Sequence, residues 1–168
     1  LSSAWGGYIR VDSDFPAVGM QAVTSGNYYL KGNNALSFAN ASDELFVPHL
    51  AASLYGGWQT RIGLINIGEQ QEEVLLKGYG ADGSVIGSEA VNMDPGEKKE
   101  IDIYNSFLNQ AASMSATVHS GRKCLLGYVE YTNYSISVQG CDAIPAASTR
   151  DRGPLLVAPI GSLNGKWH

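Results

Sequence analysis

The stretch that decides the fold is residues 58–67, Trp58-Gln59-Thr60-Arg61-Ile62-Gly63-Leu64-Ile65-Asn66-Ile67. It is rich in β-branched and aliphatic side chains, which favour extended structure. Side chains alternate between the two faces of a strand, so every second residue of this stretch shares one face. The residues on that face are Trp58, Thr60, Ile62 and Leu64. The pattern predicts a β-strand that presents one side to a core.

The residues that follow continue as strands and tight turns. Residues 73–79 and 85–91 each have the composition of a strand. Asp82-Gly83 between them supplies the positive φ angles that a tight hairpin demands. Asp94-Pro95-Gly96 is a second turn signal, since Pro fixes φ and Gly takes the left-handed position of a type II turn. Residues 98–104 alternate charged and aliphatic side chains, which predicts a half-buried strand.

The remaining elements complete an all-β pattern. Residues 105–112 place apolar side chains at three- and four-residue spacings, which predicts a short helical segment of one or two turns. Two strands then close the unit, at residues 116–120 and 124–131. A series of about seven short strands, with turns roughly every 8–12 residues, is typical of an immunoglobulin-like antiparallel β-sandwich. We therefore expect an all-β fold of that architecture.

Composition and charge agree with this fold and exclude some partners. Charged residues make up 16% of the 168 residues and Gly is abundant at 20, as suits short strands joined by tight turns. The net charge of −5 argues against a nucleic-acid partner, because binding phosphates needs a concentrated basic face. No apolar run approaches the ~20 residues of a membrane helix, so no membrane insertion is expected. No basic-then-apolar segment opens the chain, and its start is predicted to be a processed or excised end.

An internal repeat is the strongest signal beyond single strands. Two similar strand–turn–strand segments have residues at matching places. Val11 of the first segment matches Val118 of the second, and Gly19 matches Gly127. A second pair of similar segments is formed by residues 45–58 and residues 155–167, each of which ends in a tryptophan. The two comparisons give nearly the same separation, which indicates a repeat period of about 108 residues.

The places where successive repeats begin and end predict the domain organisation. Residues 46–145 are expected to form one complete β-sandwich unit. Residues 1–45 are expected to be the closing strands of a partial unit, and residues 155–168 the opening strand of a further unit that packs with 1–45 or with a neighbouring molecule. Residues 146–154 are small, polar and turn-rich, which predicts a linker.

Short motifs along most of the chain support a family resemblance. They include Phe46-Val47-Pro48-His49, Gly56-Gly57-Trp58, Gly127-Tyr128-Val129-Glu130-Tyr131 and, near the start, Trp5-Gly6-Gly7-Tyr8. Together they resemble an uncharacterised group of tandem immunoglobulin-like β-sandwich repeats of secreted or cell-surface bacterial proteins. The second unit departs from this pattern, with Ala158-Pro159-Ile160 where Pro-His would stand. The resemblance implies a β-sandwich and an extracellular location, and it carries no catalytic residues.

Catalytic and metal-binding patterns are not expected in this chain. The histidines, His49, His119 and His168, are scattered without ligand spacing, so no metal site is predicted. There is no Gly-x-Ser-x-Gly elbow and no Gly-rich phosphate loop, so neither a nucleophilic triad nor a cofactor is expected. Glu130 could face a ligand, but an outward-facing position on an edge strand is the preferred interpretation. We do not expect an enzyme.

Aromatic residues are the best sequence argument for a ligand. Five tyrosines lie in or beside predicted hairpins, and exposed aromatic rings can stack on sugar rings. They are Tyr28, Tyr29, Tyr128, Tyr131 and Tyr134. Trp58 and Trp167 occupy equivalent repeat positions, which favours a core role for both.

The two cysteines, Cys124 and Cys141, leave two alternatives. If residues 128–131 and 134–138 form a hairpin that turns at Thr132-Asn133, the cysteines fall on opposite strands. Cross-strand Cβ atoms roughly 4.5–5.5 Å apart are close to what a disulfide bridges, and a bridge would favour an oxidising compartment. Two buried free thiols are the alternative.

These observations favour a non-catalytic, extracellular structural or interaction module: a spacer, an adhesin segment or a filament subunit. The strands expected in residues 1–45 lack the rest of their own sandwich, so their exposed edges need a partner. Strand addition to copies of the same chain would provide one, as would other surface proteins. The alternative function is a carbohydrate-binding module whose partners are glycans.

Overall fold

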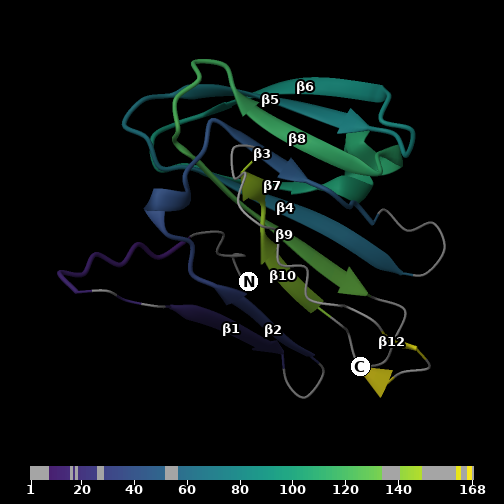
Figure 1. Cartoon of the computed structure of the whole chain (residues 1–168), viewed down its shortest axis with the longest axis horizontal. Coiled ribbons are helices and arrows are strands. Elements are labelled where there is room, and N and C mark those ends of the chain that lie inside the picture. Colours follow the sequence, from purple (N-terminus) through teal and green to yellow (C-terminus); the bar gives the residue numbers. More distant parts are fainter. Residues whose placement is uncertain are drawn as a thin grey trace, which may run out of the picture.

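The chain folds mainly into two antiparallel β-sheets that pack face to face (Figure 1). The computed structural model describes residues 8–15, 17, 19–25, 29–51, 57–133, 141–148, 162–163 and 166–167. Helical structure in the described residues consists of three short 3-10 turns. The expected all-β sandwich is therefore the observed architecture.

One sheet has four strands, in the order β10-β9-β4-β7. They are β10 (Cys141–Pro145), β9 (Leu125–Asn133), β4 (Trp58–Asn66) and β7 (Lys98–Asp102). The decisive stretch of the sequence is thus a central strand, since β4 pairs with β9 along all of its nine residues and with β7 on the other side.

The second sheet has five strands, in the order β11-β3-β8-β5-β6. They are β11 (Ala147–Ser148), β3 (Glu44–Val47), β8 (Ser113–Val118), β5 (Glu72–Tyr79) and β6 (Val85–Met93). A register shift at Gly78 and Tyr79 interrupts the pairing of β5 with β6. The outermost strands of the two sheets on one side of the molecule are β6 and β7.

The predicted turns form where the sequence places them. Gly83, between β5 and β6, has φ 81°, and Gly96, between β6 and β7, has φ 71°, a region that only glycine enters without strain. In place of one helical segment at 105–112 there are two 3-10 turns, η2 (Ile103–Asn105) and η3 (Phe107–Gln110). Asp102 and Ser106 cap their N-termini, which explains why the helical structure breaks into two single turns.

The core lies between the sheets. The side chains with the lowest exposure come from β4, β5, β8, β9, the last residue of β6 and the 3-10 turns. They include Ile62, Leu64, Val74, Leu76, Met93, Ile103, Leu108, Met114, Leu125 and Val129. The predicted face of β4 is confirmed for Thr60, Ile62 and Leu64, each at most 1% exposed. Trp58, expected in the core, is 41% exposed. It is the first residue of β4 and pairs with the last residue of β9, so it lies at the end of the sheet.

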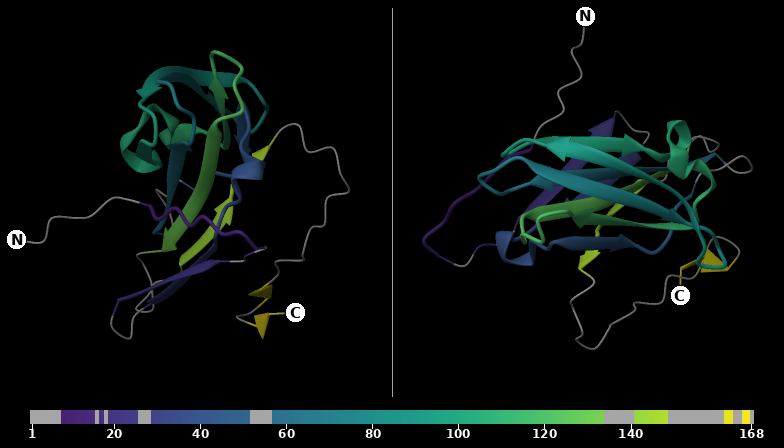
Figure 2. Two further views of the ribbon diagram at one scale, coloured as in Figure 1. Left: turned by 90° about the vertical axis from the view of Figure 1, so that its left-hand side faces the viewer. Right: turned by 90° about the horizontal axis from the view of Figure 1, so that it is seen from above.

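Residues before β3 add a hairpin outside the two sheets. Strands β1 (Met20–Ser25) and β2 (Tyr29–Asn34) pair with each other, and β2 lies beside β10 (Figures 1 and 2). A 3-10 turn, η1 (Phe38–Asn40), precedes β3.

The first predicted unit boundary, between residues 45 and 46, falls inside β3. The expected linker begins at residue 146, between β10 and β11, and includes β11, which pairs with β3. Near the C-terminus, β12 (Ser162–Leu163) and β13 (Lys166–Trp167) form a minimal hairpin. Trp58 begins a nine-residue central strand whereas Trp167 ends a two-residue strand, so the described residues do not show these two as equivalent.

Candidate functional site

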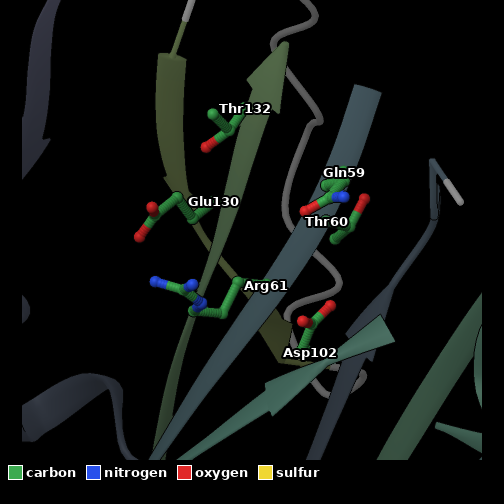
Figure 3. A pocket seen from close by; sticks show the side chains of 6 residues that line it. All are labelled: Gln59, Thr60, Arg61, Asp102, Glu130 and Thr132. Carbon is green, nitrogen blue, oxygen red and sulfur yellow. The ribbon is translucent and has the colours of Figure 1, made fainter. Parts of the chain in front are cut away.

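A row of three charged residues crosses the outer face of the four-stranded sheet. In the strand register, Arg61 on β4 lies opposite Asp102 on β7 and opposite Glu130 on β9. Figure 3 shows these side chains together with Gln59, Thr60 and Thr132, which line the same small cavity. The expected position of Glu130 on an exposed edge strand is wrong, because β9 lies between β10 and β4 and Glu130 is only 8% exposed.

The size of this cavity limits what the charged row can do. Its volume is about 10 Å³, roughly the room that one water molecule needs. The backbones of Asp102 and Glu130 are two strand spacings apart, roughly 10 Å, with Arg61 on the strand between them. Asp102 is also occupied: Oδ1 accepts from the Tyr104 amide at 3.1 Å and Oδ2 from Asn105 Nδ2 at 2.9 Å. The geometry favours a structural charge pattern over a pair of acids flanking a sugar.

A second polar group on the same face depends on the space that a glycine leaves. Gly63 leaves room for the ring of Tyr128, since a Cβ atom at residue 63 would come within 2.0 Å of it. The Tyr128 hydroxyl donates to Glu100 Oε1 at 3.1 Å, and Lys98 Nζ lies 2.7 Å from the same oxygen. Lys98 also lies 5.5 Å from the centre of the Tyr128 ring. The group ties β7 to β9 across β4.

These contacts change the acidity of both charged partners. Burial alone would lower the pKa of Lys98, but its hydrogen bonds to Glu100 and Tyr128 outweigh that effect and raise the pKa above its ordinary value. Burial would raise the pKa of Glu100, yet the hydrogen bond and charge of Lys98 lower it. Both groups are therefore held in their charged forms over a wider pH range.

The tyrosines proposed as ligand contacts do not share one surface. Tyr128 and Tyr131 point to opposite faces of β9, because three residues separate them in a strand of period two. The Tyr131 hydroxyl donates to the backbone oxygen of His49 at 2.8 Å, and its ring packs against the core. Tyr29 is the first residue of β2. Tyr28 and Tyr134 lie outside the described residues.

Of the two alternatives that the sequence left for the cysteines, the structure shows a free thiol at Cys124. Cys141 begins β10 and lies opposite Thr132, whereas Cys124 precedes the far end of β9. Seven residues, 134–140, separate β9 from β10, so the hairpin does not turn at Thr132-Asn133 and the register shifts. Cys124 carries a free, buried thiol, as in the second alternative. Burial raises the pKa of this thiol.

An open groove runs along the side of the sandwich where β6 and β7 are the outermost strands. Its volume is about 410 Å³. The apolar part of its lining includes Leu76, Val91, Ile101 and Phe107, and the polar part includes three acidic residues, Glu89, Glu100 and Asp102. The sequence reasoning missed this groove, since which strands are outermost depends on strand order. The one signal available was that residues 85–93 contain a single charged residue, Glu89.

The described part of the chain shows neither a metal-binding cluster nor a membrane-spanning helix. Within it, no group of three or more His, Cys, Asp or Glu side chains is arranged to hold a metal ion. Nor does it contain a helix with the length and apolar composition to cross a bilayer.

Comparison with known proteins gives information on the fold alone. No protein-family model and no curated protein matches the chain. Among solved structures, the chain is similar to one described as "Crystal Structure of Thermotoga maritima 1070", with a TM-score of 0.52 and 10% sequence identity. The match covers 65% of this chain and 96% of that one. The likeness is one of fold.

Proposed function

We propose that the chain is a non-catalytic, extracellular structural or interaction module that assembles through a sheet edge. A spacer, an adhesin segment and a filament subunit are the forms such a module takes. The observation that carries the proposal is β6, an outermost strand of nine residues that has one charged side chain.

Strand β6 has two features that protect sheet edges, a charge on the core side at Glu89 and an irregular register beside Ile86, but it has no lysine or proline and is nine residues long. Natural edge strands are protected by lysines, prolines, short length or inward-pointing charges. Here Val85 is 59% and Ile86 is 42% exposed, and Glu89 is the only charged residue. A long edge of this composition is suited to accept a further strand from a partner.

The pairing of the inner strands supports an immunoglobulin-like unit as part of this proposal. In that fold, strand B pairs with A and E, and strand C pairs with F. Strand β3 here pairs with β8, and β4 pairs with β9, as B with E and C with F. The place of strand A beside β3 is taken by β11, which follows β10 in the chain and so departs from the standard order. The positions of β5, β6 and β7 depart from the standard order, since β7 pairs with β4 only after the β5–β6 hairpin has been formed in the other sheet.

Tandem use and an extracellular location are supported by the sequence. The internal repeat and the resemblance to secreted repeat proteins both favour an array. The sequence of the whole gene would test this part of the proposal. Further copies of the unit on either side, with a secretion signal, are the expected result, and flanking sequence of a different kind would contradict tandem use.

Self-association tests the edge directly. We expect the chain to form dimers or larger species in sedimentation velocity as its concentration rises from micromolar to millimolar. The double variant Ser88→Lys/Ala90→Lys puts two charges on exposed positions of β6 and should shift the chain to monomer. A matched control, Ala39→Lys/Asn40→Lys, adds the same charge at exposed positions in the turn before β3, which lies three strands away from β6, and should associate like the original chain. Monomers at every concentration would contradict the proposal.

The alternative function, carbohydrate binding, gains no support from the described tyrosines. The Tyr128 ring is half-buried and bonded to Glu100, and Tyr131 faces inward. A glycan array with a hit that is lost in Tyr128→Ala would favour this alternative over the structural module.

A further inference from the structure

The five-stranded sheet ends at β6, and no strand of the described residues lies beyond it (Figure 1). On β6, Glu89 lies opposite the buried Leu76 of β5, so its side chain and that of Val91 are on the core side, where both line the groove. We propose that β6 pairs antiparallel with β6 of a second copy of this chain, about a twofold axis that passes through Ala90. The inference rests on the assembly function above and names its partner and its register.

Every second residue of β6 directs its backbone groups away from β5. The amide of His119 donates to the backbone oxygen of Glu73, so the backbone groups of Glu73 face β8 and those of the next residue, Val74, face β6. Val74 pairs with Val91, whose backbone groups therefore face β5 in return. These directions alternate along a strand. The residues of β6 whose N–H and C=O groups face outward are thus Ser88, Ala90 and Asn92.

The regular part of β6 is centred on one of these outward-facing residues. The register of β6 against β5 skips Ile86, as at a β-bulge, and bulges interrupt strand pairing. From Gly87 to Met93 the register is continuous, and Ala90 is the middle residue of this stretch. A twofold axis through Ala90 therefore pairs the whole regular stretch with its own copy, with Gly87 opposite Met93 at both ends.

Charge supports the same axis. Glu89 is the only charged residue of β6, and an axis through Ala90 places it opposite Val91 of the partner subunit. An axis through Glu89 would set the two glutamates directly opposite each other, and like charges in that arrangement destabilise a strand pair. An axis through Ser88 would bring the irregular Ile86 into the pairing. The edge is therefore most complementary to itself in the register centred on Ala90, as an interface about a twofold axis requires.

The pairing also covers side chains at the open side of the groove. Val91 is partly buried, packs against the core and lines the groove. In the dimer, Glu89 of the partner subunit would lie across from it on the same face of the joined sheet. Each sandwich would contribute its five strands to one continuous sheet, which closes both β6 edges. Because both copies use the same surface, assembly at this edge stops at two copies.

Cysteines on the outer face of β6 test the register on a non-reducing gel. Ala90→Cys should crosslink to its own copy on oxidation, because directly opposed Cβ atoms lie roughly 4.5–5.5 Å apart. Ser88→Cys and Asn92→Cys, one of them carrying a mass tag, should crosslink when they are mixed. Each of these two alone should give about tenfold less dimer, since its own copy lies four residues away along the strand, roughly 13 Å.

The three variants share their background and differ only in register. All three positions are exposed, and every variant keeps Cys124 and Cys141. Ser88→Cys that alone gives as much dimer as Ala90→Cys would overturn the register.

Glu89 provides a second readout. In the register centred on Ala90 the two glutamates are diagonal neighbours, roughly 7–8 Å apart, and their repulsion opposes the pairing. Glu89→Gln should therefore strengthen self-association about threefold in sedimentation velocity. The control Asp14→Asn makes the same change of charge at an exposed position before β1 and should associate like the original chain. Association that is unchanged or weaker in Glu89→Gln would overturn the inference.

The failure of this inference is distinguishable from the failure of the assembly function. A chain that associates while Ala90→Cys gives no more crosslinked dimer than Ser88→Cys would refute the twofold pairing and leave the assembly function standing. A chain that never associates would refute both.

Discussion

The ring of Tyr128 lies across Gly63, on the neighbouring strand, so closely that a Cβ atom at residue 63 would come 2.0 Å from Tyr128 Cε1. The two residues are direct cross-strand partners. An aromatic ring that covers a glycine restores packing that the missing side chain would have provided. It also directs the Tyr128 hydroxyl over β4 to Glu100 on β7.

Replacing Gly63 with alanine should therefore destabilise the fold. The methyl group forces the Tyr128 ring to move and disrupts its bond to Glu100, and overpacking of this kind costs about 1–3 kcal/mol. Urea unfolding of Gly63→Ala measures the loss. In the Tyr128→Ala background the same substitution should cost much less. Equal costs in the two backgrounds would show that the ring contact does not matter.

Asn66 joins two turns, and its loss should be among the most damaging single changes. Its side chain is fully buried. Nδ2 donates to the backbone oxygens of Gln70 at 2.9 Å and Met93 at 3.0 Å, and Oδ1 accepts from the Gly68 amide at 2.9 Å. Asn66→Ala leaves these buried groups without their partner, at a cost of about 3 kcal/mol. Asn92→Ala, at an exposed position, should change the free energy of unfolding by less than about 0.5 kcal/mol.

Acid should weaken the contact between β5 and the turn after β8. The pKa of Glu72 is lowered from 4.5, first by the hydrogen bond from Ser120 and also by Arg122, against the opposing effect of burial. A lowered pKa in the folded state means that the stabilisation is present above 4.5 and is lost as the pH falls below it through the folded-state value. Urea midpoints of Glu72→Gln should therefore fall less than those of the original chain between pH 6 and pH 3 (roughly the range of carboxylate titration). Ser120→Ala, which removes the first of these hydrogen bonds, should reduce the pH dependence in the same direction.

The thiol of Cys124 should react slowly while the chain is folded. It is buried, with a raised pKa, and the thiolate is the reactive form. In a Cys141→Ser variant, alkylation at pH 8 should be at least about tenfold slower in buffer than in urea. Similar rates in both solutions would contradict the buried position.

The strands and turns could be predicted because their causes are local. Alternation identified β4, and Asp82-Gly83 and Asp94-Pro95-Gly96 located the turns on either side of β6. Trp58 was expected in the core because it recurs with Trp167, but neither recurrence nor alternation gives the distance of a residue from the end of the sheet. The sequence left the pairing of Cys124 with Cys141 open, because hairpin register depends on the length of the connection, and here Cys141 lies opposite Thr132.

The candidate sites depend on contacts between distant parts of the chain. Arg61 meets Asp102 and Glu130 through the pairing of three strands that are far apart in sequence. The groove exists because β6 and β7, neighbours in the chain, end two different sheets. No residue pattern within either strand specifies which sheet it joins, so both features follow only from the strand order.

Strand β11 has a mechanical consequence. It is held to β3 by two residue pairs, Ala147 with Phe46 and Ser148 with Leu45, while β4 and β9 share nine. Tension applied from the C-terminal side reaches the sandwich at β11 first. A pulled molecule would therefore lengthen by peeling this short strand while the central sheet still bears the load, giving the chain an extensible end.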